Sequence, residues 1–241
     1  MRNLLLALFL VPVIFTSCRL ITGKRVKGNG NIRTEERPVS SFTKVEVRGA
    51  MKVYIKQGDL EPVRIEADEN LLPYIELIQN GDELTVKTKN GFNLNSSGDM
   101  KIYVTAPIYK RIQVSGACDI IGQNKIDDSE KLDLHVSGAG EIRMDVDAPS
   151  IAASISGSGN VNLKGETKKF DLELSGAGKA KCYELLSENT KVDISGAGDA
   201  EVYASVKLEA DVRGAGTVNY KGNAKSVNQH VSGAGSVNRK D

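Results

Sequence analysis

The sequence has little of what several functional classes require. It contains no tryptophan and only 5% aromatic residues, so we do not predict a broad aromatic platform for sugar rings. Two histidines, His135 and His230, are the only ones available as a catalytic base, and no nucleophile elbow is present. Neither sign of charge dominates, since 32 Lys and Arg residues face 31 Asp and Glu residues. We therefore expect two surface histidines, no serine hydrolase triad and no nucleic-acid partner.

Only three cysteines occur, and the sequence argues against a disulfide between Cys118 and Cys182. They follow their nearest repeated glycine at different distances, and three repeats separate them. In a stacked β structure that separation is roughly 14 Å, at about 4.8 Å per layer. A disulfide needs Cα atoms within about 7 Å. We expect two free thiols, with Cys182 as a small core residue.

The third cysteine, Cys18, ends a segment that is typical of bacterial lipoproteins. Arg2 precedes an apolar run of about 12 residues, which is too short to span a bilayer. The run ends in Phe15-Thr16-Ser17-Cys18, which resembles a lipobox. We predict a signal peptide over 1–17, lipidation of Cys18, a linker over 18–24 and one domain over 25–241. Arg19 in place of Asp is compatible with sorting to the outer membrane of a Gram-negative bacterium; an ordinary signal peptide with a chance cysteine is the alternative.

The mature chain repeats a phrase of the form apolar–polar–Gly–small–Gly–polar–apolar nine times. From Gly116 onward the glycine recurs at steps of 22, 19, 19, 20, 18 and 19 residues. A period near 20 with one glycine corner per period predicts an all-β, single-stranded, right-handed β-helix, or β-solenoid, with about 18–22 residues per coil. The first glycines of the phrase are Gly28, Gly49, Gly116, Gly138, Gly157, Gly176, Gly196, Gly214 and Gly233.

Alignment of the copies on this glycine shows apolar and polar columns that alternate, as in a half-buried strand. Glycine supplies the positive φ that a sharp corner needs. Met51 and Cys118 replace the second glycine, so we expect those two corners to turn differently. At the other end of the chain, Gln229 and Arg239 occupy apolar columns, and we expect them to cap the last coil against edge-to-edge growth.

The segment between Gly49 and Gly116 lacks the phrase and is expected to form either wider coils or a small sheet over the first coils. Alternating residues predict strands at 63–67, 75–79, 83–88 and 101–106, and Asn80-Gly81-Asp82 predicts a hairpin turn. Asp68 is expected to cap one helical turn. Residues 90–99, rich in Gly, Asn and Ser, predict a mobile loop.

These features together resemble the bacterial family described as putative auto-transporter adhesin, head GIN domain. The resemblance rests on Glu36-Arg37-Pro38-Val39, Gln57-Gly58-Asp59, Ala67–Ile75, Val104-Thr105-Ala106-Pro107 and the Ser-Gly-Ala-Gly corners. It covers nearly the whole mature chain. It implies a β-helical domain on an exported protein, and it supplies no catalytic residues.

One set of residues is a candidate metal site. Glu173, Asp193 and Asp211 occupy the same outward column on three successive coils. Their carboxylates would repel one another, and a hard cation such as Ca²⁺ would relieve the repulsion. A solvated acidic face neutralised by Lys191 and Arg213 is the simpler interpretation. The Gly-x-Gly phrases lack the third glycine and the helix of a dinucleotide site, so no cofactor is predicted.

We therefore predict a lipid-anchored, exported binding or structural module of the cell envelope, adhesin-like and non-catalytic. Its expected partners are the membrane, through the lipid on Cys18, and a glycan or protein ligand, and the repeat is compatible with a homo-oligomer. The alternative is a carbohydrate-active enzyme, a β-helical polysaccharide lyase or hydrolase that uses Glu173, Asp193 and Asp211.

Overall fold

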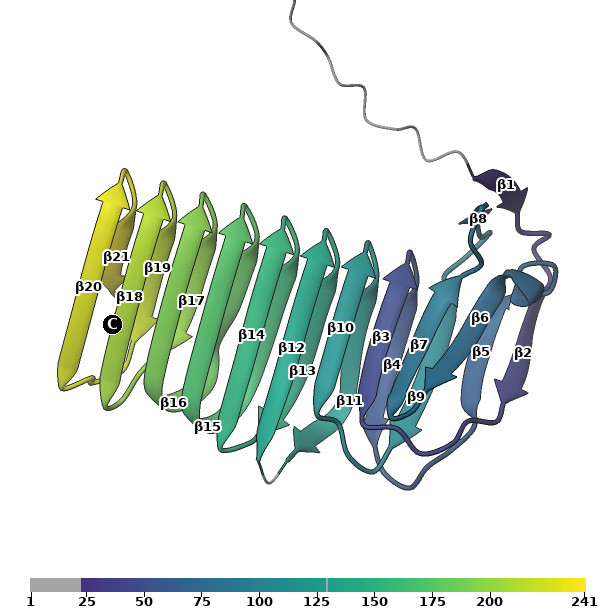
Figure 1. Ribbon diagram of the computed structural model, residues 1–241, viewed down its shortest axis with the longest axis horizontal. Coiled ribbons are helices and arrows are strands. Elements are labelled where there is room, and N and C mark those ends of the chain that lie inside the picture. Colours follow the sequence, from purple (N-terminus) through teal and green to yellow (C-terminus); the bar gives the residue numbers. More distant parts are fainter. Residues whose placement is uncertain (1–22, 129) are drawn as a thin grey trace, which may run out of the picture.

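The computed structural model describes residues 23–128 and 130–241 as a β-solenoid (Figure 1). Each coil has one strand before the glycine corner and one after it. The front sheet contains the strands before the corner: β3 (Lys44–Gly49), β10 (Arg111–Gly116), β12 (Lys131–Gly138), β14 (Ser150–Gly157), the second halves of β15 (Asn160–Gly176) and β16 (Lys179–Gly196), β18 (Lys207–Gly214) and β20 (Ser226–Gly233). The back sheet contains the strands after it: β4 (Lys52–Gln57), β11 (Asp119–Asp127), β13 (Glu141–Asp147), the first halves of β15 and β16, β17 (Asp199–Tyr203), β19 (Thr217–Lys221) and β21 (Ser236–Arg239).

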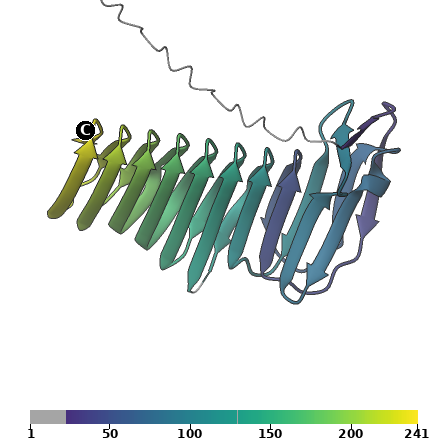
Figure 2. The same cartoon turned by 45° about the horizontal axis from the view of Figure 1, so that its top comes forward.

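The predicted period sets the register of the stack. Neighbouring front strands pair in parallel, and glycine lies opposite glycine from Gly49 to Gly233 without a slip. The single-stranded solenoid with coils of about 18–22 residues is therefore confirmed. Figure 2 shows the corners as a row along one edge of the molecule. Within the described residues, no helix is long and apolar enough to cross a membrane.

The corners depend on glycine for two reasons. Eight of the nine predicted corner glycines have φ between +103° and +126°. A Cβ atom on Gly196 would lie 2.5 Å from the carbonyl oxygen of Gly176 in the coil before it. The same oxygen accepts a hydrogen bond from the N–H of Ala197 at 2.8 Å, so the corner has no room for a side chain.

Three corner expectations need correction. Gly28 is not a corner: it lacks a positive φ, and its missing side chain leaves space for the carboxylate of Asp68. The corners that carry Met51 and Cys118 do not turn differently. Both of these side chains are buried, and the N–H of Asp119 donates to the Met51 carbonyl at 3.0 Å, as the equivalent groups do in later coils.

The core is a continuous stack of inward columns between the two sheets. The apolar residues two places before each corner glycine are at most 2% exposed from Val47 to Val212. Cys118 and Cys182 are free thiols in this core, as predicted. Burial raises the pKa of Cys118 to about 11 and that of Cys182 to about 12.

The amino-terminal end is closed by a small mixed sheet, so both expectations for residues 49–116 are partly confirmed. β7 (Glu83–Thr88) and β9 (Lys101–Ala106) continue the stack in parallel with β3 and β4. β6 (Ile75–Asn80) then pairs antiparallel with β7 through the predicted hairpin turn at Gly81. β5 (Val63–Asp68) pairs antiparallel with β9 and with β2 (Ile32–Arg37).

The segment 90–99 is not simply a loop. Its β8 (Phe92–Asn95) pairs in parallel with β1 (Lys24–Lys27), and β1 begins at the last residue of the expected linker. This two-stranded arm projects beside the closed end of the solenoid (Figure 1). The glycine, asparagine and serine residues predicted a loop because the pairing partner lies far away in the sequence.

Asp68 connects this arm to the closed end. A short 3-10 helix, η1 (Leu72–Tyr74), follows β5, but its first turn has no side-chain cap, so the predicted capping role is wrong. The fully buried Asp68 carboxylate instead accepts hydrogen bonds from Gly30 N at 2.7 Å and from both N and Oγ of Ser97 at 2.9 and 2.6 Å. Ser96 Oγ donates at 2.7 Å. Burial by itself would raise the pKa of Asp68, but these donors outweigh it and hold the pKa well below its usual value.

The first prediction concerns the corner. Gly196→Val is expected to lower the free energy of unfolding by more than about 2 kcal/mol, because the new side chain has a positive φ and contacts the Gly176 carbonyl. Asp199→Ala, in the same coil, should cost at most about 0.5 kcal/mol, because its ion pair with Lys179 is exposed. Urea melts of both variants test this, and equal losses would contradict it.

The second prediction concerns Asp68. Asp68→Asn is expected to lower the free energy of unfolding by about 2 kcal/mol at pH 7, because four donors would lose a buried charged acceptor. The folded-state pKa lies below that of the unfolded chain, so this stabilisation is complete above about pH 4 and declines as the pH falls further.

Urea melts between pH 3 and pH 7 would show the gap between wild type and Asp68→Asn narrowing with acid. Asp59→Asn, an exposed position, is the matched control and should stay within about 0.5 kcal/mol of wild type. A gap that did not change with pH would show that the carboxylate charge is not what the donors stabilise.

Candidate ligand-binding face

The predicted acidic column exists as a structural feature. Glu173 on β15 lies in register with Asp193 on β16, and Asp193 lies in register with Asp211 on β18. All three side chains point outward from the front sheet. Glu173 is exposed, whereas the side chains of Asp193 and Asp211 keep 30% and 28% of their surface. The column is therefore open to solvent.

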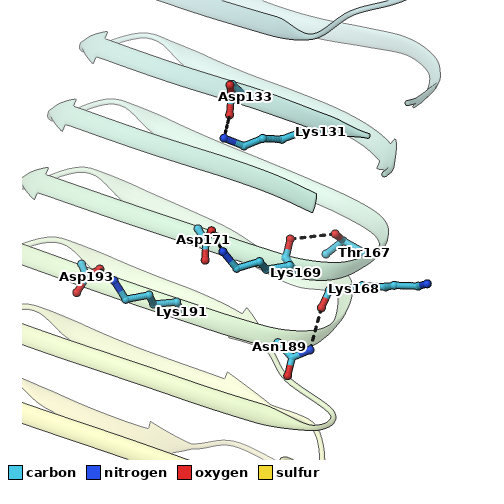
Figure 3. A network of polar contacts seen from close by, with 9 residues as sticks. All are labelled: Lys131, Asp133, Thr167, Lys168, Lys169, Asp171, Asn189, Lys191 and Asp193. Atoms are coloured by element: carbon cyan, nitrogen blue, oxygen red, sulfur yellow. Dashed lines mark hydrogen bonds and ion pairs between the residues drawn. The ribbon is translucent and has the colours of Figure 1, made fainter. Parts of the chain in front are cut away.

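Basic residues of the same strands neutralise two of these carboxylates. Lys191 Nζ lies 2.7 Å from Asp193, and Arg213 donates to Asp211. The same spacing of two residues joins Lys131 to Asp133 at 2.8 Å and Lys169 to Asp171 at 2.6 Å (Figure 3). Such exposed pairs contribute at most about 1 kcal/mol each. They arrange charge across the face rather than stabilise the fold.

The three carboxylates do not converge. Among residues 23–128 and 130–241, no group of three or more His, Cys, Asp or Glu side chains is arranged to hold a metal ion. Within the same ranges, Glu173 has neither an ion pair nor a hydrogen-bond partner. The acidic column therefore offers separate hydrogen-bond acceptors along one line.

A shallow groove includes part of the acidic column. Serines of successive coils line it together with two carboxylates and one guanidinium group. On β14 the groove is lined by Ser154 and Ser156, which pair with Glu173 and Ser175 of β15. The polar lining residues are Ser154, Ser156, Glu173, Ser175, Asp193, Ser195 and Arg213. We call this the serine groove.

The sequence did not predict one hydrogen bond at the edge of the serine groove. His135 Nδ1 shares a hydrogen bond with Ser154 Oγ, because the two residues pair directly between β12 and β14. Burial, followed by the charge of Arg111, lowers the pKa of His135 and favours its neutral form. In the described residues no carboxylate binds the second ring nitrogen, and the nearby N–H groups belong to the sheet. A hydrolase needs both an orienting acid and an oxyanion hole, so this contact is no catalytic dyad. His230 lies in the same column on β20.

Aromatic residues lie elsewhere. Tyr183 and Tyr203 do not stack on each other; Lys221 Nζ lies 5.3 Å from the centre of the Tyr183 ring. Tyr54 and Tyr103 stack on the back sheet at 5.0 Å, and Arg64 covers the second face of Tyr103 at 3.7 Å. The rings stand between neighbouring strands, so their faces contact protein. Their pairing follows from the register of β4 and β9, which the irregular spacing of the sequence conceals.

Cys18, the predicted lipidation site, and the signal peptide over 1–17 lie outside the described residues.

Comparisons with known proteins show what the fold resembles. A putative adhesin from Bacteroides fragilis matches with a TM-score of 0.84 and 22% identity, over 89% of this chain and 100% of that one. A putative lipid binding protein from Parabacteroides distasonis matches with a TM-score of 0.75 and 22% identity, over 90% of this chain and 100% of that one. A putative adhesin from the same species matches with a TM-score of 0.72 and 26% identity, over 90% of this chain and 100% of that one. No curated protein matches the sequence significantly. The sequence model for putative auto-transporter adhesin, head GIN domain, matches residues 41–224.

Proposed function

Because the chain belongs to the putative auto-transporter adhesin, head GIN domain family, we propose that it is a non-catalytic, adhesin-like module of the cell envelope that binds a glycan in the serine groove. The observation that carries this proposal is the lining of the groove. Hydroxyl, carboxylate and guanidinium groups line it in two neighbouring rows that cross successive strands. These groups exchange hydrogen bonds with sugar hydroxyls and acidic sugars.

The openness of the face supports binding over catalysis. A general acid needs a carboxyl group in a sheltered site that raises its pKa, and water reaches all three residues of the acidic column. The carbohydrate-active enzyme stays as the second candidate because carboxylates do lie on adjacent coils of a β-helix. Release of products from neutral or acidic polysaccharides, with or without Ca²⁺, would establish that alternative.

We also propose that the protein is exported and held by a lipid on Cys18, in the outer membrane of a Gram-negative bacterium. The Phe15-Thr16-Ser17-Cys18 sequence supports the anchor. Bacteroides and Parabacteroides, the sources of the similar structures, support the setting. The first described strand, β1, lies at one end of the solenoid (Figure 1). An anchor that precedes β1 therefore leaves the front sheet free for a ligand.

The third prediction tests the groove. A screen of neutral and acidic glycans should find ligands whose affinity falls at least tenfold in the double variant Glu173→Gln with Asp193→Asn, because each lost carboxylate removes charged hydrogen bonds. The matched control, Glu141→Gln with Asp145→Asn, removes two carboxylates from β13 on the back sheet and should bind like wild type. Equal loss in both variants, or no glycan ligand at all, would contradict the proposal.

The fourth prediction tests the anchor. Cys18→Ala should move the protein from washed membranes to the soluble fraction, because the acyl chains attached at this cysteine supply its membrane affinity. Ser17→Ala keeps a small residue before the cysteine and should stay with membranes. A Cys18→Ala protein that still pelleted with membranes would show that the lipobox prediction is wrong.

A further inference from the structure

The two ends of the solenoid are finished differently. At the amino-terminal end, the Arg37 guanidinium donates to the carbonyls of Ile75 and Leu72, and the amide of Gln79 binds the backbone of Ser40. β2, the outer strand of the neighbouring sheet, has the sequence Ile-Arg-Thr-Glu-Glu-Arg. Charged side chains and satisfied backbone groups are the means by which proteins prevent a sheet edge from pairing with another chain.

The opposite end lacks this protection. β20 pairs with β18 on one side, and no described strand pairs with its outer edge. Every residue of β20 is exposed, and Val227 and Val231, which point along the core columns, each keep 38% of their surface. The strand contains no Lys, Arg, Asp or Glu. Of the two residues expected to cap the last coil, Gln229 is the uncharged one and lies on β20. Arg239 lies on β21, where its guanidinium donates to Asn223 Oδ1 at 2.8 Å.

The sequence of β20 is close to symmetric about Gln229. It reads Ser226-Val227-Asn228-Gln229-His230-Val231-Ser232. We propose that two copies of this chain join by antiparallel pairing of β20 with β20 about a two-fold axis at Gln229. In this register Val227 lies opposite the partner's Val231, and Gln229 lies opposite the partner's Gln229. Inward residues face inward residues, so the apolar core continues from one solenoid into the next.

The absence of charged residues explains why β20 can pair with the β20 of a second copy. The same register applied to β18 would place Glu209 opposite a second Asp211 and Lys207 opposite a second Arg213. Like charges directly opposite one another destabilise a strand pair. In β20 the equivalent positions are Asn228 with His230 and Ser226 with Ser232, which are uncharged or hydrogen-bonding. Because the other end of the solenoid is closed, the assembly stops at two copies.

This dimer has a defined shape. The amino-terminal strands and β20 lie at opposite ends of the long axis (Figure 1), so joining two β20 strands places the two amino-terminal ends farthest apart. One strand per copy forms most of the contact, which is smaller than a standard protein interface. Dimerisation should therefore depend on concentration. The pairing does not rest on the proposed glycan or lipid.

Sedimentation of the full chain in the Cys18→Ser background, over a range of concentrations, tests the proposal. We expect a monomer–dimer equilibrium in the micromolar range. Gln229→Lys places two like charges opposite one another and should weaken dimerisation at least tenfold. Thr217→Lys adds the same charge to β19, which is paired on both sides, and should dimerise like wild type. A wild-type monomer at all concentrations, or assemblies larger than two, would overturn the proposal, as would equal effects of the two lysines.

The register has a test of its own. In the same background, Gln229→Cys should form a disulfide-linked dimer under mild oxidation, because position 229 lies opposite itself. Asn228→Cys should not, because the partner's residue at that point is His230. The buried Cys118 and Cys182 do not compete, since burial raises the pKa of both thiols. A crosslink through Asn228→Cys in place of Gln229→Cys would reject this register.

Discussion

The backbone hydrogen bond at the glycine corner is the contact on which the rest of the structure depends. From Gly49 to Gly196, the carbonyl oxygen of each corner glycine accepts a hydrogen bond from an N–H of the following coil, and a Cβ atom at the next corner glycine would collide with that oxygen. Since glycine faces glycine in every pair of front strands, the corner sets the register of the whole stack. A slip of one residue would turn each buried column to solvent. The repeated phrase is therefore a register device as well as a turn.

A fixed register places outward residues of equal rank in straight columns, about 4.8 Å apart. This spacing forms the acidic column and the row of serines in the serine groove. It also limits the chemistry of the face. Parallel strands commit their N–H groups to the sheet, so no oxyanion hole forms next to His135 and Ser154. The face can present rows of hydrogen-bonding groups to a long ligand, but it cannot surround a reacting bond and exclude water from it.

Backbone hydrogen-bonding groups and apolar columns have partners on both sides in the middle of a solenoid, but at each end one side lacks a neighbouring coil. The first coils are covered by antiparallel strands, by the side chains of Arg37 and Gln79, and by the arm that Asp68 holds in place. The last coil exposes Val227 and Val231 and a strand without charge. The same physical requirement, a partner for every backbone group and every apolar column, is met within the chain at one end. At the other end we propose that a second copy meets it.

The amino-acid sequence was sufficient to predict the period, the inward and outward columns, two free thiols, the burial of Cys182 and the hairpin at Gly81. These properties follow from local alternation and from spacing along the chain. The tertiary structure alone decided the roles of Gly28, Asp68, Ser96 and Ser97, the pairing of β1 with β8, and the stacking of Tyr54 on Tyr103. These residues lie outside the periodic phrase and meet partners far away in the sequence. Such contacts leave no periodic pattern in the sequence, because they form only when distant segments come together in the stacked coils.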